Sequence, residues 1–264
     1  MSSWLSRARW RWRHADAGVL IVSYPKCGRT WLRVLLGKAL CEQFRLDERD
    51  LMRTKELSRA AGLTPTRFVH DGTGGVAGIK WYEQKSDRSH FRSKQVVLLV
   101  RDPRDVVVSS YFQATRRMAA YRGSLADFIR DECFGIRTVL AMYAAWEASR
   151  QIPRRFLLLR YEDLHRDPVG CLRSLLGLMG CDHPDAEALA AAASHGGFDN
   201  MRRMEESGSF EKQLSPGVAG DEESYKVRRG AIGGYVEYLS PGDIAYLEQA
   251  ITAAGDPFGY LGSS

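Results

Sequence analysis

The chain has 264 residues, of which 44% are hydrophobic and 27% are charged, and its formal net charge is +6. This length suits one α/β domain or two small ones, and the hydrophobic fraction is enough for a sizeable core, which excludes a disordered chain. A run of about 18 apolar residues, which a membrane-spanning helix would need, is missing. The five cysteines lack paired spacing, so we expect no disulfide framework, no zinc site and a reducing, cytoplasmic location.

Residues 1–17 form a basic lead-in, in which tryptophan alternates with arginine. Such a segment could contact a membrane surface or an acidic partner peripherally, or it could simply fray ahead of the first strand. Its arginines interrupt any apolar core of a signal peptide. Neither an internal repeat nor a linker is visible, so we treat residues 1–264 as a single domain.

An apolar, β-branched run over residues 19–22 predicts a buried strand, which Pro25 ends. Apolar residues at helical spacing from Leu32 to Leu40 predict a helix that follows it. The loop between them contains Lys26, Cys27, Gly28, Arg29 and Thr30. A strand, a glycine-bearing loop and a helix start make an anion-binding site, because amides and the helix dipole point at the ligand. We therefore expect a phosphate or a sulfate here, although an ordinary turn with solvated cations is the simpler alternative.

This loop is not a Walker A loop. In that motif a glycine precedes the Gly-Lys pair and a Ser or Thr follows it, whereas Lys26 here precedes the only glycine of the loop. A plain ATPase or GTPase is therefore disfavoured.

Further strands and helices alternate along the chain. Strands are predicted at residues 67–70, 95–100 and 156–161, and helices at 51–61, 106–111, 125–150, 169–179, 184–194 and 241–254. Residues 198–224 are charged and glycine-rich, and we expect them to be mobile. This alternation predicts an α/β fold, with a mainly parallel central sheet flanked by helices on both faces. Ligands of such sheets bind at the carboxyl ends of the strands.

Charged clusters follow these strands. Arg101 leaves a buried strand, and Ser109 follows eight residues later, so the two could converge on one anion through a guanidinium fork and a hydroxyl. The alternative for Arg101 is a salt bridge with Asp102 or Asp105. Tyr161 is either a ligand contact or a strand end beside a helix N-cap.

Four segments, in this order, resemble those of the PAPS-dependent sulfotransferases, where PAPS is 3′-phosphoadenosine 5′-phosphosulfate. They are Tyr-Pro-Lys-x-Gly-x-Thr-Trp at 24–31, Arg-x-Pro-Arg-Asp-Val-x-Val-Ser at 101–109, Tyr-Glu-Asp-Leu at 161–164 and Arg-Arg-Gly-x-x-Gly at 228–233. The resemblance spans residues 19–235. It implies a P-loop-like three-layer sandwich and transfer of a sulfuryl group from PAPS, without a metal, to a hydroxyl or an amine of a small molecule or saccharide.

The resemblance also implies roles for single residues. The 5′-phosphosulfate would be bound by Lys26, Cys27, Gly28 and Thr30, the adenine by Trp31 and Tyr161, and the 3′-phosphate by Arg101, Ser109, Arg228, Arg229 and Gly230. Arg29 could add a second cation at the 5′-phosphosulfate or point outward. Phe198 would also lie near the adenine. Arg29 and Cys27 depart from the Thr and Ser that are usual in the family, and Gly234-Tyr235 departs from its usual Asp-Trp.

The acceptor needs a general base, and His70 is the best candidate because it ends a predicted strand between the two phosphate segments. The family places its histidine at such a strand end, after a lysine that this chain lacks. A rival is residues 78–81, which could occupy that strand position instead. Asp71 or Glu83 would then be the base.

Two other hypotheses remain at this point. A P-loop kinase of a nucleoside or small molecule would need magnesium ligands, which the sequence does not offer at a suitable spacing. A basic nucleic-acid-binding module would show a steep salt dependence. The position of the arginines at strand ends argues against nucleic acid as a partner.

Overall fold

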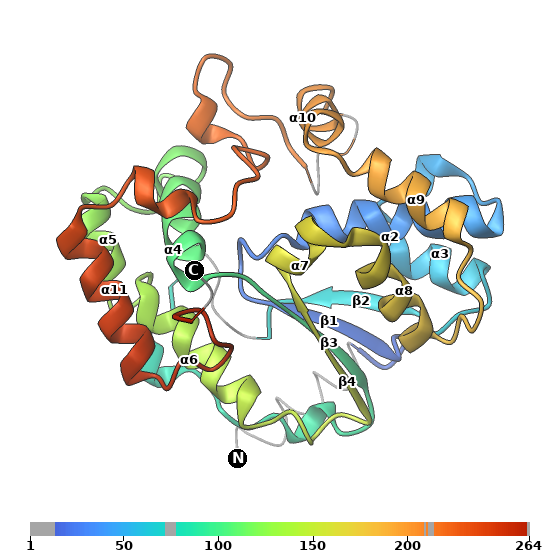
Figure 1. Ribbon diagram of the computed structural model, residues 1–264, viewed down its shortest axis with the longest axis horizontal. Helices are drawn as coiled ribbons and strands as arrows, with labels where there is room; N and C mark the ends of the chain where they lie inside the picture. The colour runs from blue at the N-terminus through green and yellow to red at the C-terminus, as the bar shows by residue number, and fades with distance from the viewer. Residues whose placement is uncertain (1–13, 72–77, 209, 211–213, 263–264) are drawn as a thin grey trace.

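The computed structural model describes residues 14–71, 78–208, 210 and 214–262 (Figure 1). Most of the basic lead-in over residues 1–17 lies outside the described residues. The described residues form a four-stranded sheet in the order β2-β1-β3-β4. Its strands are β1 (Val19–Ser23), β2 (Thr66–Val69), β3 (Gln95–Val100) and β4 (Arg155–Arg160). All neighbouring strands are parallel, which confirms the prediction.

The two central strands are apolar because both of their faces are covered. Every residue of β1 is buried, and so are the last five residues of β3. Continuous apolar runs of this kind are typical of parallel sheets with helices on each side. Ile21 of β1 pairs with Phe68 of β2 and with Val97 of β3.

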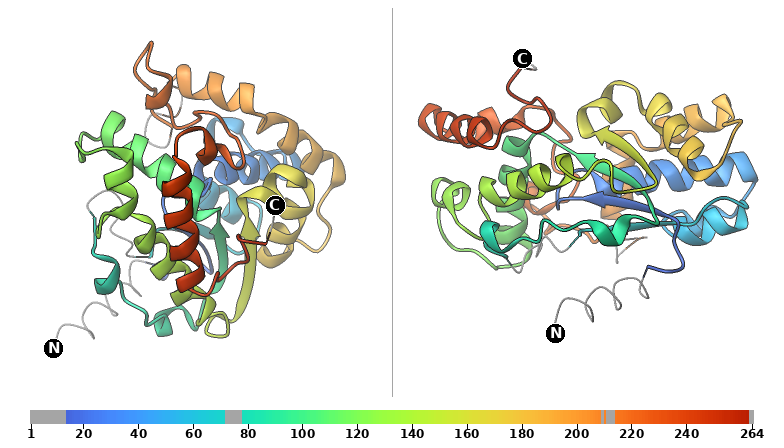
Figure 2. Two further views of the ribbon diagram at one scale, coloured as in Figure 1. Left: turned by 60° about the vertical axis from the view of Figure 1, so that its left-hand side comes forward. Right: turned by 90° about the horizontal axis from the view of Figure 1, so that it is seen from below.

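Helices cover the sheet in two groups (Figures 1 and 2). The first group is α2 (Arg29–Phe44), α3 (Thr54–Ala60), α7 (Tyr161–Arg166), α8 (Pro168–Met179) and α9 (Ala186–His195). The second group is α4 (Pro103–Phe112), α5 (Leu125–Arg130), α6 (Ile136–Glu147) and α11 (Pro241–Ala253). The three-layer sandwich predicted from the sequence is therefore confirmed.

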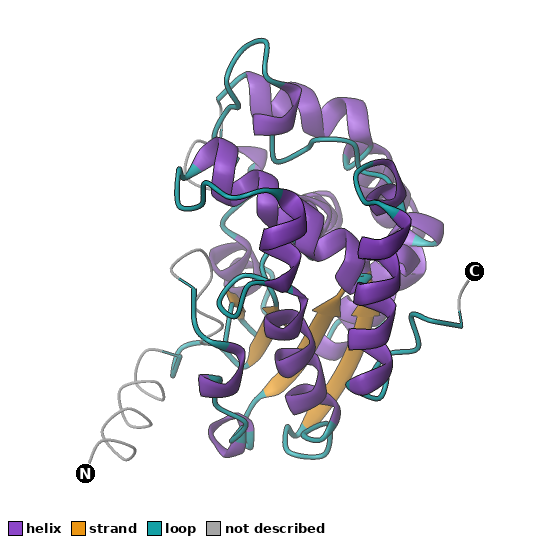
Figure 3. Cartoon of the chain, turned by 90° about the vertical axis from the view of Figure 1, so that its left-hand side faces the viewer, coloured by secondary structure: helices purple, strands orange, loops and turns teal. Residues whose placement is uncertain are grey.

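The parallel strands end at one edge of the sheet (Figure 3). The segments that follow the strands, among them residues 24–28 and 101–102, begin at this edge. Helix α10 (Phe198–Glu206) and the chain around residues 214–235 cross above the edge, between the two helix groups (Figure 1). This edge is therefore where segments far apart in the sequence can form one site.

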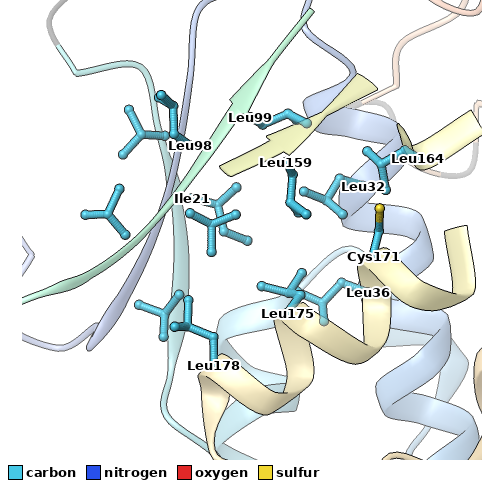
Figure 4. Close-up of a cluster of buried hydrophobic side chains, with 14 of the residues drawn as sticks. Ile21, Leu32, Leu36, Leu98, Leu99, Leu159, Leu164, Cys171, Leu175 and Leu178 are labelled. Atoms are coloured by element: carbon cyan, nitrogen blue, oxygen red, sulfur yellow. The ribbon is translucent and has the colours of Figure 1, made fainter. Parts of the chain in front are cut away.

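Leucines hold the first helix group on the sheet. Figure 4 shows Leu32 and Leu36 of α2 and Leu175 of α8 in one cluster with Ile21 and other buried side chains of the sheet. All four of these side chains have no exposed surface. Each buried leucine contributes about 1.5–3 kcal/mol relative to an exposed one, so the cluster fixes where α2 begins.

Two predictions about helices were wrong. Residues 125–150 do not form one helix, because α5 ends at Arg130 and α6 begins at Ile136. The Asp131 carboxylate accepts hydrogen bonds from the amides of Cys133 (2.7 Å) and Phe134 (3.0 Å), and these bonds turn the chain. In the stretch expected to be mobile, residues 198–206 form the regular helix α10, which buries Met201 and Glu205.

Candidate active site

The loop between β1 and α2 is shaped by two residues with positive φ. Gly28 has φ of 91°, and a Cβ atom added to it would lie 2.6 Å from Cδ2 of Tyr161. Only glycine fits this position, since both the backbone conformation and the tyrosine ring exclude a side chain. Lys26 has φ of 72°, a strained conformation for a residue with a side chain. The loop thus turns sharply into the first amides of α2, as an anion site requires.

The side chain of Lys26 lies among other cations. Its Nζ donates to Oε1 of Gln113 at 3.2 Å. The pKa of Lys26 is lowered to about 7, mainly by burial and then by the charges of Arg117, Lys226 and Arg101. An anion that binds beside this buried lysine would stabilise its protonated form and raise its pKa.

Arg101 joins the first loop to a loop late in the chain. Its guanidinium donates to the carbonyl of Lys26 at 3.5 Å and to the carbonyl of Ala231 at 2.9 Å. It also lies 4.3 Å over the ring of Tyr161 and 3.3 Å from Asp105. Its Nε is buried and has no hydrogen-bond partner among the described residues, so one donor of this fork is unsatisfied.

Asp105 holds the late loop in place. Its two carboxylate oxygens accept from the amides of Gly233 (2.9 Å) and Tyr235 (3.0 Å). This is why residues 230–235 lie beside α4, although they are far from it in the sequence. Arg101 therefore does pair with Asp105, which was the alternative expected from the sequence. Asp105 also anchors the late loop, and Arg101 still contacts the carbonyls of Lys26 and Ala231.

Arg228 and Arg229 reach this loop, but their guanidinium groups are held by carboxylates. Arg228 donates to Glu223 at 2.8 Å and to the hydroxyl of Tyr238, and it lies 4.5 Å over the ring of Phe112. Arg229 is bonded to Glu237. Ser109 is half-buried in α4. The predicted contact of these residues with a 3′-phosphate stays a prediction.

Aromatic rings gather on the other side of the first loop. Trp31 packs against His165 at 4.6 Å and Tyr161 at 5.5 Å, and its Nε1 donates to the carbonyl of Gly196 at 2.8 Å. Phe198 is 44% exposed and touches Gly230, where an added Cβ would meet its ring at 2.8 Å. These rings could stack on a base, which is worth about 1–3 kcal/mol.

His70 lies directly after β2, beside the end of β1. Its Nδ1 is 3.2 Å from the carbonyl of Ser23. A carbonyl can only accept, so Nδ1 carries the proton and Nε2 has the lone pair of the neutral ring. The pKa of His70 is lowered to about 4, mainly by burial and then by the charges of Arg29 and Arg33. The ring is therefore neutral at pH 7, the state that a base needs.

The rival position for the base is not realised. Residues 81–83 form a 3₁₀ turn instead of a strand, and Glu83 is exposed there. The carboxylate of Asp71 is 2.6 Å from Nε of Arg88 and accepts from Nε1 of Trp146 at 3.0 Å. Asp71 thus anchors the chain next to His70 by a buried ion pair.

Replacing Arg88 with Met should lower the free energy of unfolding by about 3–5 kcal/mol, because the buried carboxylate of Asp71 loses its cation. Urea denaturation measures this loss. The matched control is Arg92→Met, since Arg92 is exposed in the same segment. A loss for Arg88→Met no larger than for the control would show that the ion pair does not hold this segment.

Three contacts near Lys26 were not predicted from the sequence. Gln113 and Arg117 lie on a π-turn, Gln113–Arg117, which continues α4. Glu205 of α10 has no exposed side-chain surface, and it accepts from the amides of Lys226 (2.7 Å) and Val227 (2.8 Å) and pairs with Arg117 at 3.5 Å. Glu205 thereby fixes the chain just before Arg228. The sequence signal for these contacts is limited to Lys226, which lies two residues before the Arg-Arg-Gly motif.

Two hollows adjoin these residues. A cavity of about 20 Å³ lies beside Lys26, between Tyr24, Phe128 and Phe134, and it admits little more than a water molecule. A groove of about 250 Å³ lies on the outer side of β2, and Arg33, Arg67 and Phe68 are among its lining residues. The groove approaches the size of a small-molecule site.

The fold and site define a class of protein: an α/β protein with a glycine-bearing loop at a helix start and cations gathered at the carboxyl ends of parallel strands. Comparison with known proteins names the class more closely. The family model described as "Sulfotransferase domain" matches residues 16–256. The chain belongs to the sulfotransferase family.

Relatives agree with this assignment. The chain is 24% identical over 262 residues to flavonol 3-sulfotransferase of Flaveria bidentis, covering 88% of this chain and 80% of the relative. It is 25% identical over 251 residues to cytosolic sulfotransferase 16 of Arabidopsis thaliana, covering 84% and 71%. A crystal structure of retinol dehydratase with retinol and PAP has the same fold, with a TM-score of 0.64, 16% identity and coverage of 89% and 80%.

The protein is therefore a PAPS-dependent sulfotransferase, and the kinase and nucleic-acid-binding hypotheses give way to this assignment. Among the described residues, no group of three or more His, Cys, Asp and Glu side chains could hold a metal ion. No helix in the described part of the chain is long and apolar enough to cross a membrane.

Proposed function

We propose that Lys26 binds the phosphosulfate of PAPS and that His70 removes the proton from an acceptor hydroxyl or amine. The sulfuryl group then moves directly from PAPS to the acceptor. One observation carries this proposal. Arg101 bonds to the backbone of both Lys26 and the late loop, so the two segments predicted to bind opposite ends of PAPS share one site.

The donor supplies a sulfuryl group that is activated by its bond to phosphate. Lys26 and the first amides of α2, with Thr30, would hold this end and stabilise the charge that develops on the leaving phosphate. Arg101, Ser109 and the 228–230 segment would hold the 3′-phosphate, with Trp31 and Tyr161 at the adenine. The protein's contribution is then mainly positioning and electrostatic stabilisation, by analogy with phosphoryl transfer.

Binding of PAP, the product nucleotide, should weaken as the pH rises above about 7. The pKa of Lys26 is about 7 before an anion binds, so its charge is present below that pH and is lost above it. Affinity then falls by up to about tenfold per pH unit. Calorimetric titration with PAP between pH 6 and 9 measures this slope.

The variant Lys26→Arg serves as the control for this titration, because arginine keeps its charge over the whole range. Its slope should be flat. An equal slope in the two proteins would show that another group is titrating.

The acceptor class follows from the same chemistry. The Flaveria relative is named for a flavonol, a hydroxyl compound. We extend this to a small molecule or saccharide with a hydroxyl, or less often an amine, placed at His70. All five cysteines are free thiols and the Arabidopsis relative is named as cytosolic, which supports a cytoplasmic location for this chain.

The test is transfer of radiolabelled sulfate from PAPS to a panel of phenols, alcohols, glycolipids and saccharides. Calorimetry with PAP, and with ATP and magnesium, accompanies it. We expect labelled product from at least one acceptor and tighter binding of PAP than of ATP. Preference for ATP with magnesium, together with an absence of labelled product, would overturn the proposal.

A further inference from the structure

Two arginines lie on α2, beginning at the edge of the sheet where the strands end. Arg29 and Arg33 are four residues apart, so they lie on one face of the helix, about 6 Å apart along its axis. Both are half-buried, and burial lowers the pKa of each. None of the carboxylates in the described ranges forms an ion pair with either guanidinium. A partly buried cation without a counter-ion is costly, so an anion that completes this pair would be stabilised.

Two rings near the end of strand β2 lie close to these arginines. Phe68 is in β2 and His70 is the residue directly after it, so their backbones are about 7 Å apart along the extended chain. The guanidinium of Arg33 lies 4.3 Å over the ring of Phe68. Arg29 has a larger effect than Arg33 on the pKa of His70. Arg33 thus lies over Phe68, and the charge of Arg29 acts on His70.

Arg33 and Phe68 also line the groove beside β2. Its cations are Arg33, Arg53, Lys55 and Arg67, and its carboxylate is Glu56. Three of these cations already have partners: Lys55 (2.7 Å) and Arg67 (3.5 Å) pair with Asp16, and Arg53 pairs with Asp50 (3.0 Å). Within the described chain, Arg33 is the cation of the groove that has no carboxylate partner.

The cavity beside Lys26 is too small for an acceptor. The cavity beside Lys26 has a volume of about 20 Å³, whereas the groove at Arg33 has about 250 Å³. Arg29 is the first residue of α2, so it is close enough to the anion loop to pair with the phosphosulfate. Arg33 lies one turn further along α2 and lines the groove together with Phe68.

We propose that the acceptor carries an anionic group, a carboxylate, sulfate or phosphate, which Arg33 binds over Phe68 with support from Arg29. The hydroxyl that receives the sulfuryl group would then lie about 7 Å away, at His70. The guanidinium fork suits two oxygens of such a group. This inference rests on the proposed function, because it takes His70 as the point where the acceptor reacts.

Two phenols of similar size test the inference: 4-hydroxyphenylacetate, which has a carboxylate at about this distance from its hydroxyl, and 4-ethylphenol, which is neutral. Each is titrated calorimetrically into the complex with PAP of the wild type, of Arg33→Met and of Arg173→Met. Arg173 is an exposed arginine on α8 and gives the matched control. The rate of transfer from radiolabelled PAPS to each phenol is measured in parallel.

In the wild type and the control, the acid should bind at least about tenfold more tightly than the neutral phenol. In Arg33→Met, this preference should fall by about 10- to 100-fold, with PAP affinity within twofold of the wild type. Equal binding of the two phenols by the wild type, or a preference that survives Arg33→Met, would overturn the inference. Weaker PAP binding by Arg33→Met would also overturn it and assign Arg33 to the donor. If the wild type does not bind PAP at all, the proposed function itself fails.

Discussion

Replacing Lys26 with Ala is expected to lower the turnover number by about 10²- to 10³-fold, the usual cost of removing one electrostatic contact to the transition state. Lys26 is the cation at the start of the anion loop, and three further cations act on its charge. Without it, the negative charge on the leaving phosphate would face only the amides and the more distant arginines. Single-turnover transfer from radiolabelled PAPS measures the effect on the chemical step.

The control for this variant is Lys85→Ala, because Lys85 is exposed and lies outside the site. It should keep the wild-type rate. A Lys26→Ala protein with a rate within about threefold of the wild type would remove Lys26 from its proposed role.

Replacing His70 with Ala is expected to lower turnover by about 10²- to 10⁴-fold, as loss of a general base does in other enzymes. PAP affinity should stay within about twofold, since His70 contacts the end of β1 and does not belong to the nucleotide-binding segments. Steady-state rates and PAP titrations on the same protein separate the two effects.

Exposed His183 provides the comparison, as His183→Ala should change neither quantity. If His70→Ala lost PAP binding in proportion to turnover, the ring would be holding the nucleotide. If it kept its turnover, the base would lie elsewhere.

The strands were predictable because their signal is local. β1 and β3 are buried on both faces, so their sequences are apolar without interruption, and few other elements give that pattern. The break between α5 and α6 was not predictable in the same way. The apolar positions on its two sides keep helical spacing, and the turn depends on hydrogen bonds from the Asp131 side chain.

Helix α10 was not predicted from the sequence for a different reason. Its sequence is charged, which predicts a solvated segment, yet Glu205 is buried. The burial of Glu205 is offset by Arg117 and by the amides of residues 226 and 227, which come from distant parts of the chain. Tertiary partners of this kind leave no periodic trace in the sequence.

In the site, the motifs predicted which segments meet, but not the contacts of each side chain. Lys26, Arg101 and the late loop lie together, as the motifs imply. The sequence gives no sign that Arg228 and Arg229 pair with Glu223 and Glu237, because those carboxylates lie outside any motif. For these two arginines to contact a 3′-phosphate, they must exchange one anion for another.

A crystal structure of the protein with PAP tests the central claim most directly, namely that Lys26, Arg101 and the late loop bind one nucleotide. The account predicts the 5′-phosphate at Lys26 and the first turn of α2. It predicts the 3′-phosphate at Arg101 and Ser109, with Arg228 or Arg229 released from its carboxylate. A nucleotide bound elsewhere, or a 3′-phosphate that does not contact Arg101, would contradict it.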